Sequence, residues 1–197
     1  MDPGARGRCS PEPRAPSILD WGCGPGRVTR HLPTVFPGAD VHGADYNPAY
    51  VRWCAANLPT ATFRPCGLLP PLPYGDDAFD LVISISIFTH LSAAAHEAWV
   101  AELARVLRPG GVAFVTTMGD AYRVQLAPAQ RDRYDAGALV AKGDVAEGHR
   151  TYSAHQPPAF FRALAEGHFE VTKHTPGEAR AWGLEQDVWV LRRPPRP

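Results

Sequence analysis

The chain has 197 residues, 45% of them hydrophobic, and this length is enough for one domain with a substantial buried core. The 20 Lys and Arg residues balance the 20 Asp and Glu residues, and a formal net charge of zero provides no general attraction to nucleic acid or to an anionic membrane. Proline is the outlier, because 21 residues are about twice the average usage, and both ends of the chain are rich in it.

The sequence also excludes several classes of protein. The longest apolar run, at 81–88, is far shorter than the ~20 residues of a membrane-spanning helix. Residues 1–16 contain four prolines and no apolar core, so we interpret them as a flexible leader and not as a secretory signal. No C-x-x-C pair occurs among the four cysteines, and no spacing of His, Cys and acids predicts a metal site. We therefore expect a cytoplasmic protein with reduced thiols and no bound metal.

Short apolar runs alternate with helical stretches in the first part of the chain. The pattern predicts strands at 17–20, 41–44, 61–64, 79–85 and 112–117, and helices at 27–36, 48–57 and 93–107. Asn47 and Ser92 are suitable N-caps for the second and third of these helices. The fourth strand is apolar on both faces, which is typical of a central strand of a parallel sheet covered by helices. This alternation predicts an α/β fold.

The second half is less regular. It contains a helical piece at 128–134, weak extended segments at 138–142 and 150–154, and a helix at 157–165. Two closing strands are predicted at 169–174 and 187–191. We expect a single domain over 17–193, with 119–160 as an insertion and 194–197 as a tail.

The most informative segment is ILDWGCGPGR, residues 18–27. Three alternating glycines between a strand and a helix let the backbone turn sharply and approach a ligand closely, and the following helix start offers free N–H groups. The dinucleotide-binding fingerprint G-x-G-x-x-G requires glycine at position 27, where this chain has Arg27. Asp20 stands directly before the turn.

DWGCGPG at 20–26 resembles the first motif of the class I S-adenosylmethionine-dependent methyltransferases, which is an acid, one residue and then G-x-G-x-G. Asp45, at the end of the second predicted strand, matches the acid that binds the ribose hydroxyls in this family. The segments at 66–91 and 102–117 are similar to the adenine loop with the fourth strand, and to the next helix and strand. The resemblance covers about 100 residues and implies a Rossmann-like, seven-stranded, mostly parallel sheet with helices on both faces.

The resemblance also implies that S-adenosyl-L-methionine is the cofactor. Its expected contacts are Asp20, Gly22, Cys23, Gly24, Gly26, Arg27, Asp45, Tyr46, Cys66, Gly67, Leu68, Ser84 and Ile85. Many family members have Asp or Asn near position 66, where a thiol is a poor hydrogen-bond acceptor. We therefore expect adenine recognition by the backbone of Gly67 and Leu68, with apolar packing from Leu68 or Tyr46.

The family reaction is an in-line displacement, in which the protein mainly positions the two partners. A general base is needed only where the nucleophile must lose a proton. His90, just after the fourth predicted strand, is the best-placed candidate, and it is equally suited to capping or packing the helix at 93–107. His155 and Asp120 are weaker candidates.

The sequence thus predicts transfer of a methyl group to an O, N or C nucleophile of a small molecule, without a nucleic-acid or membrane partner, and leaves a homodimer open. One alternative is a non-catalytic cofactor-binding or scaffold protein. Another is an NAD-dependent oxidoreductase, which Arg27 and the lack of a Y-x-x-x-K pair disfavour. Family members often carry covering helices before the first strand. For this chain we expect an open acceptor site, a cover from 119–160 or from a second subunit, or a longer natural chain.

Overall fold

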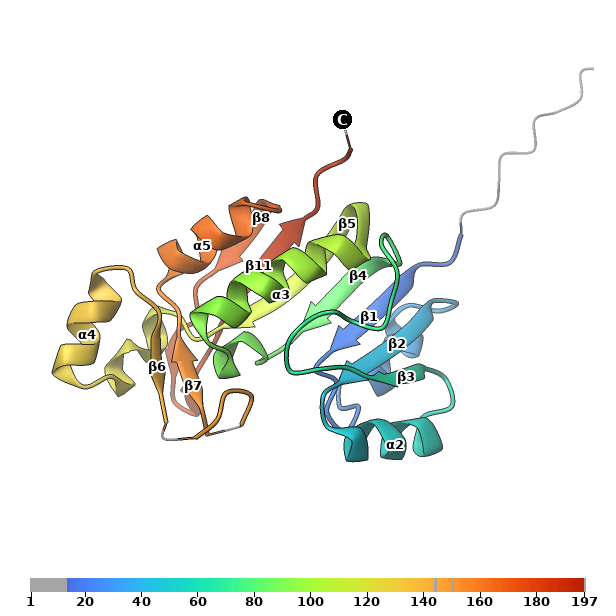
Figure 1. The fold of residues 1–197 in the computed structure, drawn as a ribbon, viewed down its shortest axis with the longest axis horizontal. Helices are drawn as coiled ribbons and strands as arrows, with labels where there is room; N and C mark the ends of the chain where they lie inside the picture. Colours follow the sequence, from blue (N-terminus) through green and yellow to red (C-terminus); the bar gives the residue numbers. More distant parts are fainter. Residues whose placement is uncertain (1–13, 144, 150, 197) are drawn as a thin grey trace, which may run out of the picture.

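The computed structural model describes residues 14–143, 145–149 and 151–196 (Figure 1). This part of the chain forms a seven-stranded sheet in the order β3-β2-β1-β4-β5-β11-β8. Its strands are β1 (Ser17–Trp21), β2 (Asp40–Asp45), β3 (Thr62–Pro65), β4 (Phe79–Ser84), β5 (Leu107–Thr117), β8 (Glu170–Thr175) and β11 (Asp187–Arg192). The first five run parallel, and β11 is antiparallel to both of its neighbours. The predicted mostly parallel, seven-stranded sheet is confirmed.

Helices cover both faces of this sheet. On one face lie α3 (Ala93–Val106) and α5 (Pro158–Glu166), and Figure 1 shows them side by side across the sheet. Trp99, Leu103 and Phe161 from these helices join the larger hydrophobic core. A smaller core lies under the 3₁₀ helix η1 (Thr29–His31) and α1 (Leu32–Val35), with members from β1, β2 and β4.

The other elements lie around this layered centre. They are α2 (Pro48–Asn57), η2 (Phe88–His90), η3 (Asp120–Gln125), α4 (Pro128–Asp135), β6 (Val140–Lys142), β7 (Ser153–His155), β9 (Ala179–Arg180) and β10 (Gly183–Leu184). The weak extended segments near 138–142 and 150–154 correspond to β6 and β7, which pair antiparallel. The β9–β10 hairpin falls in a region predicted as loop. In the described ranges, no helix has the length and apolar character needed to cross a membrane.

The predicted helix at 27–36 is shorter and broken in the structure. Only the 3₁₀ turn η1 and four residues of α1 are helical there. Pro33 is the reason, because it has no N–H to donate to a carbonyl in the preceding turn and therefore interrupts the helical ladder.

The strand order places a ligand crevice between β1 and β4. From β1 the chain proceeds outward to β2 and β3 and then returns to β4 on the other side of β1. Connections on the two sides of such a switch point lie on opposite faces of the sheet, which leaves an opening at the carboxyl ends of the strands. The loops after β1, β2 and β4 meet there.

Both ends of the described chain bind near the amino end of β4, on the side of the sheet opposite the crevice. Arg14 donates two hydrogen bonds to Asp80, at 2.9 and 2.7 Å, and Arg193 and Arg196 pair with Asp77. Residues 1–13 of the predicted leader, and residue 197 of the predicted tail, lie outside the described residues.

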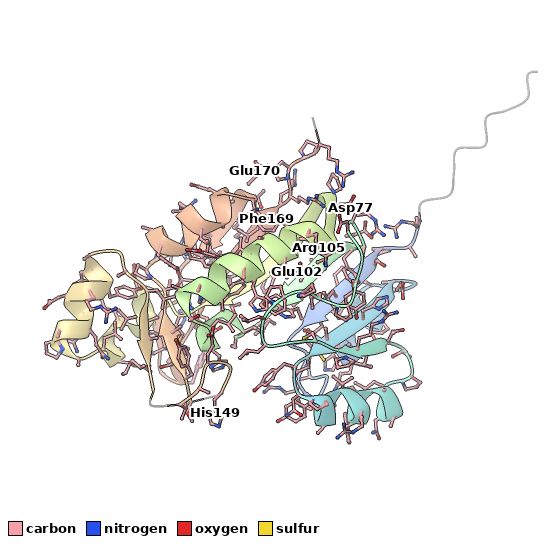
Figure 2. The ribbon with its side chains drawn as sticks, in the orientation of Figure 1. Asp77, Glu102, Arg105, His149, Phe169 and Glu170 are labelled. Atoms are coloured by element: carbon pink, nitrogen blue, oxygen red, sulfur yellow. The ribbon has the colours of Figure 1, made fainter. Side chains whose placement is uncertain are left out.

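A buried carboxylate on α3 fixes the loop before β4. Figure 2 shows Glu102 and Arg105 together on this helix. Glu102 Oε1 accepts hydrogen bonds from the backbone N–H of Leu72 and from Arg105, both at 2.6 Å. Arg105 also donates to Asp76 at 2.7 Å and to the Tyr74 carbonyl at 2.9 Å. The pair therefore ties the loop that follows β3 to the main helix.

We expect Glu102→Ala to lower the free energy of unfolding by about 3 kcal/mol, because it leaves a buried N–H and a half-buried guanidinium without their partner. Urea denaturation at pH 7 measures this change. Glu97→Ala is the matched control, since Glu97 is exposed on the same helix, and its effect should stay within about 0.5 kcal/mol. Equal losses in the two variants would contradict the assignment.

Candidate functional site

The glycine-rich turn after β1 packs against the ends of β2 and β4. The backbone N–H groups of Gly22 and Cys23 both donate to the Ala44 carbonyl, at 2.7 and 3.1 Å. Gly22 has a φ of +76°, and a Cβ atom there would lie 2.1 Å from Cδ1 of Ile87. A side chain at this position would therefore need a strained backbone conformation and a shift of the Ile87 side chain.

Asp45, the last residue of β2, is a buried carboxylate held in one orientation. Its Oδ2 accepts a hydrogen bond from Gly24 N at 2.8 Å, and its Oδ1 accepts one from Asn47 N at 2.7 Å. Only 6% of the residue is exposed. An ionised carboxylate has about four acceptor positions, so two backbone donors leave room for two hydroxyl groups of a ligand.

A pocket opens beside Asp45, and we call it the first pocket. It is lined by Trp21, Gly22, Asp45, Tyr46, Cys66, Gly67, Leu68, Ile87, His90, Leu91, Trp99 and Gly148. The rings of Trp21 and Trp99 lie 4.3 Å apart between centroids, and Trp99 Nε1 donates to the Leu68 carbonyl at 2.9 Å. Apolar walls with one fixed carboxylate suit a flat heterocycle attached to a group with hydroxyls.

The connection between β6 and β7 lies against this pocket. Gly148 N donates to the His90 carbonyl, and the Tyr46 hydroxyl donates to the Gly148 carbonyl, each at 2.9 Å. Glu147 accepts a hydrogen bond from Ser92 N at 2.6 Å. Figure 2 places the neighbouring His149 in the same connection. The β6–β7 connection therefore contributes to the first pocket, and a cover of the acceptor site by 119–160 stays a prediction.

Burial alters the ionisation of groups around the glycine turn. Desolvation raises the pKa of Asp20 to about 6, against the opposing effect of a 2.5 Å hydrogen bond from the Thr29 hydroxyl. Burial also raises the pKa of the Cys66 thiol to about 12 and increases that of Cys23. Both thiols are therefore protonated at neutral pH and are not nucleophiles.

A second, more open pocket lies beyond the ends of β4 and β5, and we call it the second pocket. It is lined by Ile85, Thr116, Tyr122, Thr175, Pro176, Trp182, Leu184, Glu185, Gln186 and Val188. Ile85 belongs to this pocket and Ile87 to the first, so the segment after β4 borders both.

Comparison with known proteins gives consistent matches. A family model described as a methyltransferase domain matches residues 18–111. An uncharacterized methyltransferase from Synechocystis sp. is 38% identical over 102 residues, which are 48% of this chain and 43% of that protein. A trans-aconitate 2-methyltransferase from Paracidovorax citrulli is 34% identical over 98 residues, or 50% of this chain and 37% of that protein. A crystal structure of Burkholderia thailandensis 1,6-didemethyltoxoflavin-N1-methyltransferase with bound 1,6-didemethyltoxoflavin and S-adenosylhomocysteine has a TM-score of 0.67 at 18% identity, covering 92% of this chain and 72% of that chain.

The matched segment contains the glycine turn, Asp45 and most walls of the first pocket. Over residues 18–111 the chain is similar to a methyltransferase domain, and both of these relatives are named as methyltransferases. It spans less than half the length of these two curated relatives. The second pocket is built mostly from residues that follow the matched segment.

The methyltransferase fold brings together part of the predicted cofactor site. Six of the predicted contacts line the first pocket: Gly22, Asp45, Tyr46, Cys66, Gly67 and Leu68. Asp20, Cys23, Gly24 and Gly26 lie at or just before the turn but are not among the lining residues. Arg27 is exposed and lines neither pocket.

The last two of the predicted contacts, Ser84 and Ile85, lie in different environments. Ser84 is fully buried, and its hydroxyl has no hydrogen-bond partner within the described ranges. Ile85 is 42% exposed and lines the second pocket. Ile87, two residues further along the chain, lines the first pocket.

The candidate bases lie in different environments. His90 lines the first pocket, with Nδ1 2.7 Å from the Tyr152 carbonyl, so this nitrogen carries the proton. His155 is 1% exposed, burial lowers its pKa, and neither ring nitrogen has a partner in the described part of the chain. Asp120 accepts a hydrogen bond from the Tyr134 hydroxyl at 2.9 Å. None of the three lines the second pocket, and a base role for each stays a prediction.

Sequence reasoning missed five residues of the first pocket: Trp21, Ile87, Leu91, Trp99 and Gly148. Trp21 lies between Asp20 and Gly22 in the glycine motif, and this position is the feature that could have marked it as a pocket residue. Trp99 belongs to the larger hydrophobic core and also lines the first pocket. Within the described ranges, no group of three or more His, Cys, Asp or Glu side chains is arranged to hold a metal ion.

Proposed function

We propose that this chain binds S-adenosyl-L-methionine in the first pocket and transfers its methyl group to a small molecule. One observation carries the proposal: a buried carboxylate, fixed by two backbone N–H groups, lines an apolar pocket directly beside a turn of three glycines with positive φ.

Each part of the cofactor has a matching group in this chain. Asp45 accepts hydrogen bonds from the two ribose hydroxyls, a charge-assisted arrangement that fixes orientation. Leu68 and Trp21 pack on the adenine ring, and the backbone of Gly67 bonds its edge. Asp20, just before the turn, meets the ammonium group of the methionine part, which stabilises the ionised form of this carboxyl.

When bound, the cofactor supplies a methyl group on a positively charged sulfur; the acceptor nucleophile forms the new bond to the methyl carbon while the sulfur keeps the electrons of the broken bond. The protein contributes position, since holding two reactants in line converts a bimolecular reaction into a unimolecular one. His90 lines the first pocket, and its hydrogen bond to the Tyr152 carbonyl holds the connection between β6 and β7 in place. A homodimer and a cytoplasmic location stay predictions.

Calorimetry with S-adenosylhomocysteine and NAD, titrated separately into the full chain, tests the cofactor. We expect binding of the first and none of the second. NAD binding without S-adenosylhomocysteine binding would favour an oxidoreductase instead. Release of S-adenosylhomocysteine in the presence of an acceptor separates an enzyme from a non-catalytic cofactor-binding protein.

A further inference from the structure

The second pocket adjoins the proposed cofactor site through one short segment. Ile85 lines the second pocket and Ile87 lines the first, and two residues of chain span at most about 7 Å. We infer that the second pocket holds the methyl acceptor and selects a neutral, planar aromatic compound with an oxygen substituent over a carboxylate. This inference rests on the proposed function, because it assigns the cofactor to the first pocket.

Aromatic and apolar side chains form most of the pocket wall. Trp182, in the turn of the β9–β10 hairpin, is 75% exposed, and Pro176 lies on the same pocket. Tyr122 is fixed in place, because its hydroxyl donates to the Leu184 carbonyl at 2.8 Å. A large exposed indole beside apolar neighbours is a surface to which a flat ring can stack.

The charge of the pocket disfavours an acidic ligand. In the described part of the chain, no Lys or Arg lines it, and its one ionisable acid is Glu185. Glu185 pairs with Arg180 at 3.1 Å, and the same guanidinium also pairs with Glu178 at 3.2 Å. A carboxylate placed here would lose water beside an acid without gaining a cation, which is unfavourable.

One polar group is oriented to bind an oxygen atom. Gln186 Oε1 accepts hydrogen bonds from the hydroxyls of Ser86 at 3.0 Å and Thr116 at 2.6 Å. Its Nε2 donates to no protein group within the described ranges, so its N–H groups are available in the pocket. A carboxamide held through its oxygen presents its nitrogen to a hydroxyl or carbonyl oxygen of a ligand.

The segment that joins the two pockets is held in an uncommon conformation. Ser86 has a φ of +62°, in the left-handed region that favours glycine, and its N–H donates to Thr116 Oγ1 at 2.8 Å. Such strain persists only where the surroundings determine it, and it concentrates at functional sites. Here the same two side chains, Thr116 and Gln186, hold Ser86 and line the second pocket.

Two probes that differ mainly in charge test the inference: 2-naphthol, which is neutral at pH 7, and 2-naphthoate. Each is titrated calorimetrically into the full chain saturated with S-adenosylhomocysteine, which keeps the probes out of the first pocket. We expect 2-naphthol to bind at least about tenfold more tightly than 2-naphthoate. Equal or tighter binding of 2-naphthoate would overturn the inference.

Substitutions then locate the probe. Trp182→Ala should weaken 2-naphthol binding about tenfold through the lost stacking, whereas Trp53→Ala, which removes an exposed tryptophan of α2, should leave it unchanged. Gln186→Glu keeps the acceptor oxygen but removes the donor, and we expect about a fivefold loss. Unchanged affinity in Trp182→Ala would exclude the second pocket.

The outcomes separate the two proposals. Failure of the wild-type chain to bind S-adenosylhomocysteine would contradict the proposed function itself. Normal S-adenosylhomocysteine binding without detectable 2-naphthol binding would contradict only the inference about the acceptor.

Discussion

Replacement of Asp45 by alanine is expected to weaken binding of S-adenosylhomocysteine about a hundredfold. Hydrogen bonds to a charged group contribute about 1.5–3 kcal/mol each, and a hundredfold change in affinity corresponds to about 2.7 kcal/mol. Two ribose hydroxyls on a carboxylate that backbone donors already orient therefore account for a loss of this size. Calorimetry at pH 7.5 measures it.

The control lies on the same strand. Asp40→Ala removes a carboxyl from the opposite end of β2, where its side chain is 65% exposed, and should leave the affinity unchanged. Because Asp45 also binds the N–H groups of Gly24 and Asn47, thermal unfolding of each variant must be measured in parallel. A folded Asp45→Ala protein with an affinity within about threefold of wild type would remove Asp45 from the site.

Local features of the sequence predicted the sheet and the position of the glycine turn. Apolar runs bounded by Gly, Pro and Asn marked all seven strands, and the glycine turn followed from spacing alone. These features depend on neighbouring residues in the chain. The walls of the first pocket do not, since Trp21, Leu68, Trp99 and Gly148 come from four separate segments.

The end of β4 shows why the division between the two pockets was not predicted from the sequence. The apolar run predicts a strand through residue 85, but the strand ends at Ser84 and Ser86 takes a left-handed conformation. This turn assigns Ile85 and Ile87 to different pockets. Serine carries no signal for such a conformation, which here results from hydrogen bonds to Thr116 and Gln186, far along the chain.

The hairpin that carries Trp182 was missed for a different reason. Its strands, β9 and β10, have two residues each, which is too short for an alternating pattern to appear. Its contribution to the second pocket depends on tertiary position. The only feature of the sequence that could have indicated a pocket here is a tryptophan between short polar segments, and such a residue is not specific for a binding site.

The affinity for S-adenosylhomocysteine is expected to rise with pH between about 5 and 7 because of Asp20. Burial raises the pKa of this carboxyl to about 6, and the proposed contact with the ammonium of the ligand requires its ionised form. Below pH 6 a proton must be released before binding, so the affinity falls by up to about tenfold for each pH unit. Above about pH 7 the affinity should level off. Calorimetry at several pH values, in buffers of different ionisation enthalpy, measures the affinity and the released proton.

The stability of the free protein should show the opposite trend for the same group. A carboxyl whose pKa is raised by folding contributes stability below its unfolded value of 3.8, and this contribution is lost as pH rises through about 6.

Two variants test which group releases the proton on binding. Asp20→Asn removes the titrating carboxyl, so it should flatten the pH profile of binding and weaken the affinity at pH 7.5. His90→Gln removes the histidine that lines the first pocket and should leave the slope in place. A slope that persists in Asp20→Asn and disappears in His90→Gln would assign the linked proton to the histidine, and the ammonium would then need a different partner.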